Sequence, residues 1–165
     1  YKDTKREVPI LSAVAGANQE DVQLSYDDNE ETAWGNNGQL NTAWITYTLA
    51  RESQIDDICL KLGGFRRNSY PVEVYAGSAL VWQGQTPESL GYIHLKTKPV
   101  KTNKITLKLK GSVVDEEAFS EIVELSEENV KASSKQSSQK EVKAKPQKGK
   151  NVFRIIEVEF LETIK

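Results

Sequence analysis

Short runs in which every second residue is apolar recur along the chain. They occupy residues 58–62, 72–75, 93–96, 105–109 and 156–160. Alternation at period two puts apolar side chains on one face and polar ones on the other, which is typical of half-buried antiparallel strands. The pattern therefore predicts an all-β fold, an antiparallel β-sandwich of the jelly-roll kind in which each sheet has one wet face.

Two further segments fit the same architecture. Residues 43–49 are rich in aromatic and β-branched side chains, which favour strands. Ala76-Gly77-Ser78 lies between two alternating runs and indicates a hairpin turn. We expect Trp34 and Trp44 to pack in the core and Trp82 to be more open.

The segment 126–150 differs from the rest of the chain. It contains seven Lys, five Ser and three Glu and no aromatic residue, so its net charge is +4 and the remaining residues carry −6. Such a composition cannot bury enough apolar area to offset the entropy of ordering. We interpret the chain, residues 1–165, as a single domain with a flexible Lys/Ser-rich insertion at 126–150.

Charge and composition exclude several classes of function. The formal net charge of −2 argues against a nucleic-acid-binding domain. No apolar run approaches the about 20 residues that a membrane span needs, so we expect no membrane partner. The chain of 165 residues contains no Met and begins at Tyr1, so we interpret it as a piece of a longer protein, monomeric when isolated.

Candidate catalytic groups are few. His94 is the one histidine and lies on the polar side of its strand, so an exposed histidine is the simpler interpretation. Cys59, the one cysteine, lies within an alternating apolar run and is interpreted as a sheet thiol rather than a nucleophile. Carboxylates are plentiful, but spacing alone does not bring two of them together. We expect no catalytic site in this fragment.

An acidic loop offers different chemistry. Residues 27–32 read Asp-Asp-Asn-Glu-Glu-Thr, and calcium takes six to eight oxygens from carboxylates, carbonyls and hydroxyls. Asp27 and Thr32 could supply side-chain oxygens. The alternative is an ordinary solvated acidic loop, and composition alone does not decide between the two.

The order of several motifs resembles a known family. Asp27, Asn29, Thr32 and Trp34 precede Trp44-Ile45-Thr46-Tyr47-Thr48-Leu49, as in the discoidin-like, coagulation factor type C domains, which include carbohydrate-binding modules of family thirty-two. The likeness covers about residues 22–162. More narrowly, Leu60 to Arg66, Tyr70-Pro71-Val72 and Leu90-Gly91-Tyr92 are similar to a discoidin-like domain at the C-terminal end of Bacteroidetes family two glycoside hydrolases, the β-galactosidase group.

The resemblance implies a galactose-binding-domain-like jelly roll with one structural calcium ion. The matching ligands are Asp27 and Thr32, with Glu157 from the last strand closing the site. Asp28 stands where the family has a glycine, a position that requires a positive φ. Residues 119–125 also resemble a last strand, so Glu124 competes with Glu157.

Sugar contacts in the family come from variable loops, so they must be sought by chemistry. A sugar needs an aromatic face and fork-like donors. Arg66, Arg67, Asn68 and Tyr70 offer both in one interstrand turn, and Asn36 offers an amide in another. Surface ion pairing is the alternative role for the two arginines.

The resemblance implies a non-catalytic accessory domain of a secreted or periplasmic glycoside hydrolase. Its partner would be a weakly bound glycan, or the catalytic domain of the same polypeptide. The alternative is a purely structural domain without a ligand, which packs on its neighbour.

Overall fold

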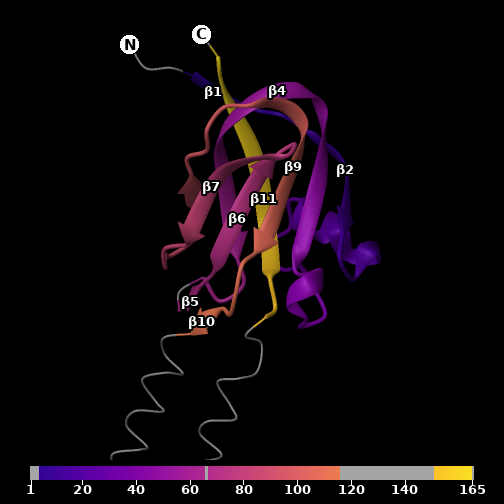
Figure 1. The fold of residues 1–165 in the computed structure, drawn as a ribbon, viewed down its shortest axis with the longest axis vertical. Helices are drawn as coiled ribbons and strands as arrows, with labels where there is room; N and C mark the ends of the chain where they lie inside the picture. The colour runs from indigo at the N-terminus through magenta and orange to yellow at the C-terminus, as the bar shows by residue number, and fades with distance from the viewer. Residues whose placement is uncertain (1–3, 66, 116–150, 165) are drawn as a thin grey trace, which may run out of the picture.

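The computed structural model describes residues 4–65, 67–115 and 151–164 (Figure 1). Nine of their strands hydrogen-bond into one antiparallel sheet that folds over into two layers, and two more form a separate small ribbon. The first layer contains β8 (Ile93–Leu95), the second half of β4 (Trp44–Leu62), β11 (Arg154–Ile164), β1 (Thr4–Glu7) and β3 (Trp34–Gly35). The second layer contains β2 (Ile10–Ala15), the first half of β4, β9 (Lys101–Leu109), β6 (Pro71–Ala76) and β7 (Ala79–Gln85).

Strand β4 joins the two layers. Its first half pairs with β2 and β9, and its second half pairs with β11 and β8. The register with β9 shifts between Thr48 and Ser53, where the strand bends from one layer to the other. Because β4 alternates buried and exposed residues in both halves, it contributes one inner face and one outer face to each layer.

The core lies between the layers. The largest fully buried side chains include Trp34, Tyr47, Phe153 and Phe160. Tyr47 and Phe160 pack with their ring centroids 5.3 Å apart, and Trp34 meets Phe153 edge to face. The Trp34 indole N–H donates to the carbonyl of Ala17 at 3.0 Å, so its polar atom is satisfied inside the core.

The expected all-β sandwich is confirmed. Each of the alternating runs lies in a strand, and Gly77, with φ of 62°, makes the turn between β6 and β7. Two details differ from expectation. A bulge between Ile155 and Glu157 interrupts the alternation of β11. Trp44 is only half buried, because it lies on the outer face of β4 rather than in the core.

The two ends of the sandwich differ. Strands β1 and β11 pair near the chain termini, while β5 (Asn68–Ser69) and β10 (Val114–Asp115) form a small ribbon at the opposite end (Figure 1). Short 3-10 helices, η1 (Gln19–Ser25) and η2 (Leu40–Thr42), flank the second layer and its loops. The expected insertion at 126–150 lies outside the described residues. Within the described part of the chain, no helix is long and apolar enough to cross a membrane.

Candidate functional site

The acidic loop lies across the outer face of the first layer. Asp27 follows η1, and Glu157 projects from β11 to meet it. The loop is fixed at a second point, where the Glu30 carboxylate accepts hydrogen bonds from Lys61 at 2.6 Å and from Tyr92 at 3.1 Å. Residues distant in sequence therefore converge as the resemblance implies.

Hydrogen bonds organise the Asp27 site. Thr32 donates its hydroxyl to Asp27 Oδ2 at 2.8 Å and also lies 3.1 Å from the carbonyl oxygen of Asn29. The backbone N–H of Asn29 donates to Asp27 Oδ1 at 3.1 Å and to Glu157 Oε2 at 3.3 Å. Two carboxyl groups, one hydroxyl and one carbonyl thus lie within one hydrogen-bonded cluster.

The two carboxyl groups share a hydrogen bond and titrate together. Burial, followed by the hydrogen bond with Asp27, raises the pKa of Glu157 to about 7. Burial alone would raise the pKa of Asp27 too, but hydrogen bonds from Thr32 and Glu157 hold it below its ordinary value. Glu157 is therefore the group that keeps a proton when no cation is present.

These oxygens are of the chemical kind that binds hard cations. No group of three or more His, Cys, Asp or Glu side chains among residues 4–65, 67–115 and 151–164 is arranged around a metal position. A cation here would therefore rely on Asp27, Glu157, the Thr32 hydroxyl and carbonyls such as that of Asn29. An adjoining cleft of about 320 Å³ is also acidic. Its lining includes Glu7, Asp28, Glu157 and Glu159.

The loop geometry matches the family pattern at Asp28. This residue adopts φ of 61°, the left-handed region that favours glycine. The chain therefore keeps the turn, although a side chain at this position introduces steric strain that a glycine would avoid. Glu157 faces Asp27 in the structure. The competing Glu124 lies outside the described residues.

The predicted sugar contacts in the loop after β4 lie in different environments. Arg66 lies outside the described residues, and Arg67 is exposed. Asn68 donates its amide to the carbonyl of Gly63 at 3.1 Å, while its buried Oδ1 has no donor among the described residues. Of this set, Arg67 is the described residue with the most exposed position.

Two of the predicted sugar contacts are structural instead. Tyr70 is 2% exposed, and its hydroxyl donates to the Gly63 carbonyl at 2.7 Å. The ring packs on Phe153, with centroids 5.8 Å apart, so it closes the end of the core. This corrects the expectation that Tyr70 lines a sugar site.

Asn36 is likewise committed to the fold. Its amide donates to the carbonyl oxygens of Gln39 and Asn151, and its Oδ1 accepts the backbone N–H of Phe153 at 2.8 Å. The side chain ties the loop before η2 to the segment that enters β11. It is 7% exposed, so the expectation of a sugar contact at Asn36 is corrected too.

His94 and Cys59 face each other across β8 and β4 without a catalytic arrangement. His94 Nδ1 lies 2.9 Å from Asp57, whose other oxygen accepts a hydrogen bond from Lys96 at 2.8 Å. Burial, with the nearby charge of Glu159, raises the pKa of the Cys59 thiol to about 11. A thiol with this pKa is protonated at neutral pH and is a poor nucleophile.

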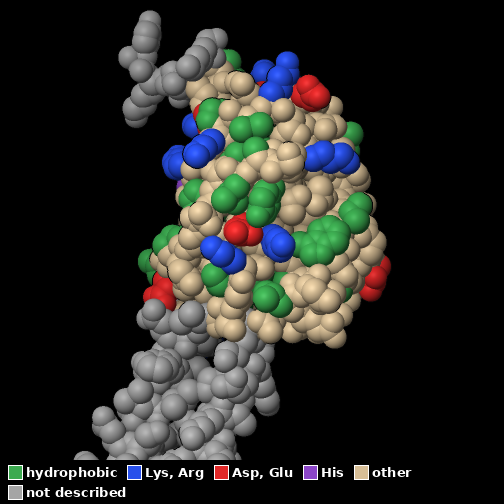
Figure 2. Space-filling view, in the orientation of Figure 1, with side chains coloured by type: hydrophobic (Ala, Val, Ile, Leu, Met, Phe, Trp, Pro, Cys, Tyr) green, Lys and Arg blue, Asp and Glu red, His purple; other side chains and the backbone are tan. Residues whose placement is uncertain are grey.

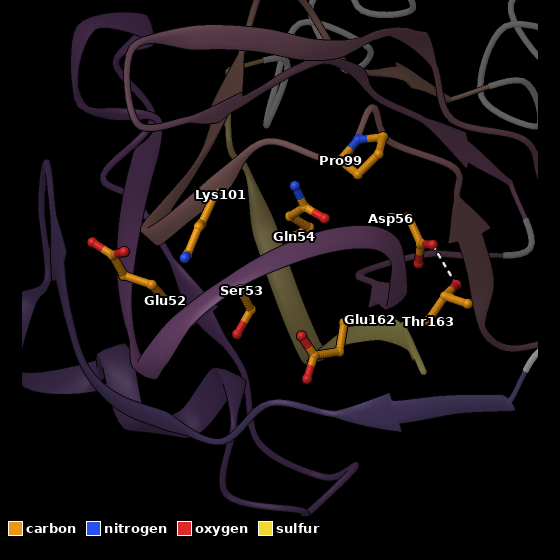
Figure 3. A pocket seen from close by; sticks show the side chains of 8 residues that line it. All are labelled: Glu52, Ser53, Gln54, Asp56, Pro99, Lys101, Glu162 and Thr163. Atoms are coloured by element: carbon orange, nitrogen blue, oxygen red, sulfur yellow. Dashed lines mark hydrogen bonds between the residues drawn. The ribbon is translucent and has the colours of Figure 1, made fainter. Parts of the chain in front are cut away.

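A polar cleft of about 480 Å³ opens at the end of the sandwich near the termini. Figure 3 shows that β4 provides Glu52, Ser53, Gln54 and Asp56, and β11 provides Glu162 and Thr163. Its carboxylates raise the question of a glycosidase-like pair, which requires one carboxyl group with a raised pKa.

Two of its carboxylates, Glu162 and Asp56, do not meet that requirement. The hydrogen bond from Arg51, together with one from Arg6, holds the pKa of Glu162 below its usual value. Burial would raise the pKa of Asp56, but hydrogen bonds from Lys5 and Thr163 outweigh it and lower the pKa. Both groups are thus stabilised as anions, and their contacts tie β1 and β11 to β4.

The sequence interpretation overlooked the outer face of the second layer. Trp44 and Thr46 on β4 lie beside Lys108 and Thr106 on β9, and the two threonine hydroxyls are 2.7 Å apart. Glu73 on β6 continues the same row. The signal was the polar half of each alternating run, which had been interpreted only as wet surface.

Comparison with solved structures defines the fold. The chain shares its fold with a truncated AlyQ that contains family 32 carbohydrate-binding and alginate lyase domains, at a TM-score of 0.68 and 12% identity. That match covers 99% of this chain and 35% of the other. No family model and no curated protein matches the sequence.

Two single-module structures are also similar. The family 32 module of AlyQ in complex with 4,5-unsaturated mannuronic acid has a TM-score of 0.64 at 12% identity, and the match covers 94% of this chain and 97% of that one. The family 32 module of NanJ from Clostridium perfringens in complex with galactose has a TM-score of 0.57 at 13% identity, with 96% and 100% covered. The described sandwich therefore has the fold of family 32 modules.

Proposed function

We propose that this chain is a non-catalytic, carbohydrate-binding accessory domain. The observation that carries the proposal is the fold, which spans nearly the whole of modules whose structures hold a sugar. The motif order from Asp27 to Leu49 supports it independently of the fold. Asp56 and Glu162 of the polar cleft are stabilised as anions, so neither suits the role of a general acid.

We further propose that the parent is a secreted or periplasmic glycoside hydrolase of the β-galactosidase-like kind. This rests on the sequence resemblance around residues 43–49 and 60–66. Similar domains are joined to catalytic ones, since a match to a family 89 glycoside hydrolase from Clostridium perfringens covers 14% of that enzyme. The domain would hold the catalytic part near its glycan, or pack against it.

A structural calcium ion belongs to the same proposal. Asp27, Thr32 and Glu157 would hold it, together with the carbonyl of Asn29, and the ion would replace the proton that Glu157 otherwise keeps. Its role would be to fix the loop 27–32 on the first layer, away from the exposed Arg67.

The test is a glycan array followed by titration calorimetry on the isolated chain. Binding of at least one glycan is the expected result, and Arg67→Ala, with Arg66→Ala, should weaken binding several-fold if the loop is the contact. Lys98→Ala, an exposed change elsewhere, is the control. Absence of binding to every glycan, with the chain folded, would favour the alternative of a purely structural domain.

A further inference from the structure

The outer face of the second layer combines aromatic rings with lysines. We call it the lysine–aromatic face and define it by Trp44 on β4, Lys104 and Lys108 on β9, Glu73 and Tyr75 on β6, and Lys110 just after β9. The strand register places Trp44 beside Lys108, and Lys108 beside Glu73. Trp44, Lys108 and Glu73 therefore form a continuous row across three strands, and Tyr75 lies in the next row, beside Thr106.

The lysines on this face differ in how many hydrogen bonds and ion pairs they make. Lys110 lies 4.0 Å from Glu73 and donates to Gln83 at 3.2 Å. Lys104 donates to Thr48 at 2.8 Å. Lys108 is exposed and makes no hydrogen bond or ion pair with any residue that the structure describes. Its ammonium group is therefore available at the middle of the row.

The rings are held in place at the surface. A Cβ at Gly16 would lie 2.7 Å from the Trp44 indole nitrogen, so the absence of a side chain there gives the indole its position. Tyr75 is half buried and donates its hydroxyl to Glu73 at 3.0 Å. Trp44 and Tyr75 lie on strands separated only by β9, about 10 Å apart across the sheet.

The charge of this face contrasts with that of the chain. Lys108 and Lys110 flank one carboxylate, Glu73, and Lys104 lies further along β9, although the residues outside 126–150 carry a net charge of −6. Figure 2 shows a face on which Lys and Arg side chains flank an acidic group, with apolar side chains around them. Exposed Val14 and Leu80 extend the apolar rim at either edge strand.

We propose that the lysine–aromatic face binds a segment of an acidic polysaccharide, one that carries uronic acid carboxylates. The proposal rests on the proposed carbohydrate-binding function and adds a surface and a substrate class to it. Sugar rings stack on Trp44 and Tyr75, which present flat apolar surfaces. Lys108 pairs with a uronate carboxylate between them, in a charge-assisted contact. The glycan runs across the strands rather than into a loop pocket.

The experiment measures binding of short oligogalacturonates and alginate oligomers to the whole chain by titration calorimetry. Methyl-esterified forms of the same oligomers are the uncharged probes. Lys108→Glu should weaken binding of the acidic oligomers at least tenfold, and Tyr75→Ala several-fold. Lys98→Glu makes the same charge change in the connection between β8 and β9 and should alter affinity less than twofold. Added salt should weaken binding of the wild type and reduce the difference from Lys108→Glu.

The outcomes separate this inference from the proposed function. Equal affinity of wild type and Lys108→Glu for an acidic oligomer would overturn the inference, as would binding of neutral glycans alone. In both cases the domain would remain a carbohydrate-binding one. Failure of the folded wild type to bind any glycan would overturn both proposals. Circular dichroism of each variant verifies the fold before titration.

Discussion

The two layers of the sandwich present opposite kinds of outer face, although β4 contributes to both. On the first layer two carboxylates are buried: Asp57 is 3% exposed beneath its contacts with His94 and Lys96, and Glu157 is 5% exposed beneath the loop 27–32. On the second layer Lys104 and Lys108 are exposed. The difference shows that a pattern of alternating polar residues does not by itself define function. The polar side chains of such a strand can support the fold, as on the first layer, or remain exposed to a ligand, as on the second.

The largest expected effect concerns the covered face and its cation. A calcium ion that binds only the folded state adds roughly 2.7 kcal/mol to the free energy of unfolding at a hundredfold excess over Kd. Chelation should therefore lower the melting temperature by several degrees. Asp27→Ala should remove this sensitivity, whereas Lys108→Ala should keep it.

Differential scanning calorimetry with chelator and with millimolar calcium makes that measurement, and elemental analysis counts the bound ion. Superimposable melts and no bound calcium would contradict the site. The loop would then be held only by its hydrogen bonds from Thr32 and Asn29.

The next effect compares one buried charge with one exposed charge. The buried Asp57 carboxylate contacts both His94 and Lys96. Burial would raise the pKa of Asp57, but the hydrogen bonds with these two residues outweigh it and lower the pKa. Asp57→Ala should cost about 2 kcal/mol of the free energy of unfolding, since it removes two charge-assisted hydrogen bonds.

Lys108→Ala is the matched change on the open face and should shift stability by less than about 0.5 kcal/mol. Urea unfolding of both variants measures the difference. Equal losses in the two variants would show that the lysine–aromatic face is as structural as the covered one.

A smaller effect is a dependence on pH in the presence of chelator. The native state keeps the proton on Glu157 up to about pH 7, whereas the unfolded chain releases it near the ordinary value of 4.5. Since the folded pKa is the higher one, stability contributed by the protonated group falls as pH rises from about 4.5 to 7.

Glu157→Gln keeps a neutral donor beside Asp27 and should therefore reduce this decline. The melting temperature of wild type and variant, followed from pH 4.5 to 7.5, checks the prediction. A decline of the same size in the variant would assign it to another group, such as Glu7, whose pKa is raised by burial and by Glu159 and Asp28.

The sequence predicted what depends on local pattern and missed what depends on long-range contacts. Alternation marked the strands, and the family resemblance implied that Asp27 meets a glutamate of the last strand, with Glu157 and Glu124 as the two candidates. Tyr70 and Asn36 were predicted to contact a sugar because they lie in turns. Their hydrogen-bond partners, Gly63 and Phe153, instead hold them inside the fold. Alternation alone does not show which face of a strand is buried, so the sequence predicts Trp44 in the core. The pairing of its strand with β2 and β9 shows that Trp44 lies on the outer face.

The most direct test of the account is a nuclear magnetic resonance footprint of a bound glycan on the whole chain. Titration with an acidic oligosaccharide should shift the backbone amides of Thr46, Tyr75 and Lys108, and leave those of Asp57 and Glu157 on the covered face unchanged. Shifts confined to the covered face, or no shifts with any acidic or neutral glycan, would contradict the claim that this is a carbohydrate-binding domain whose second layer carries the binding surface.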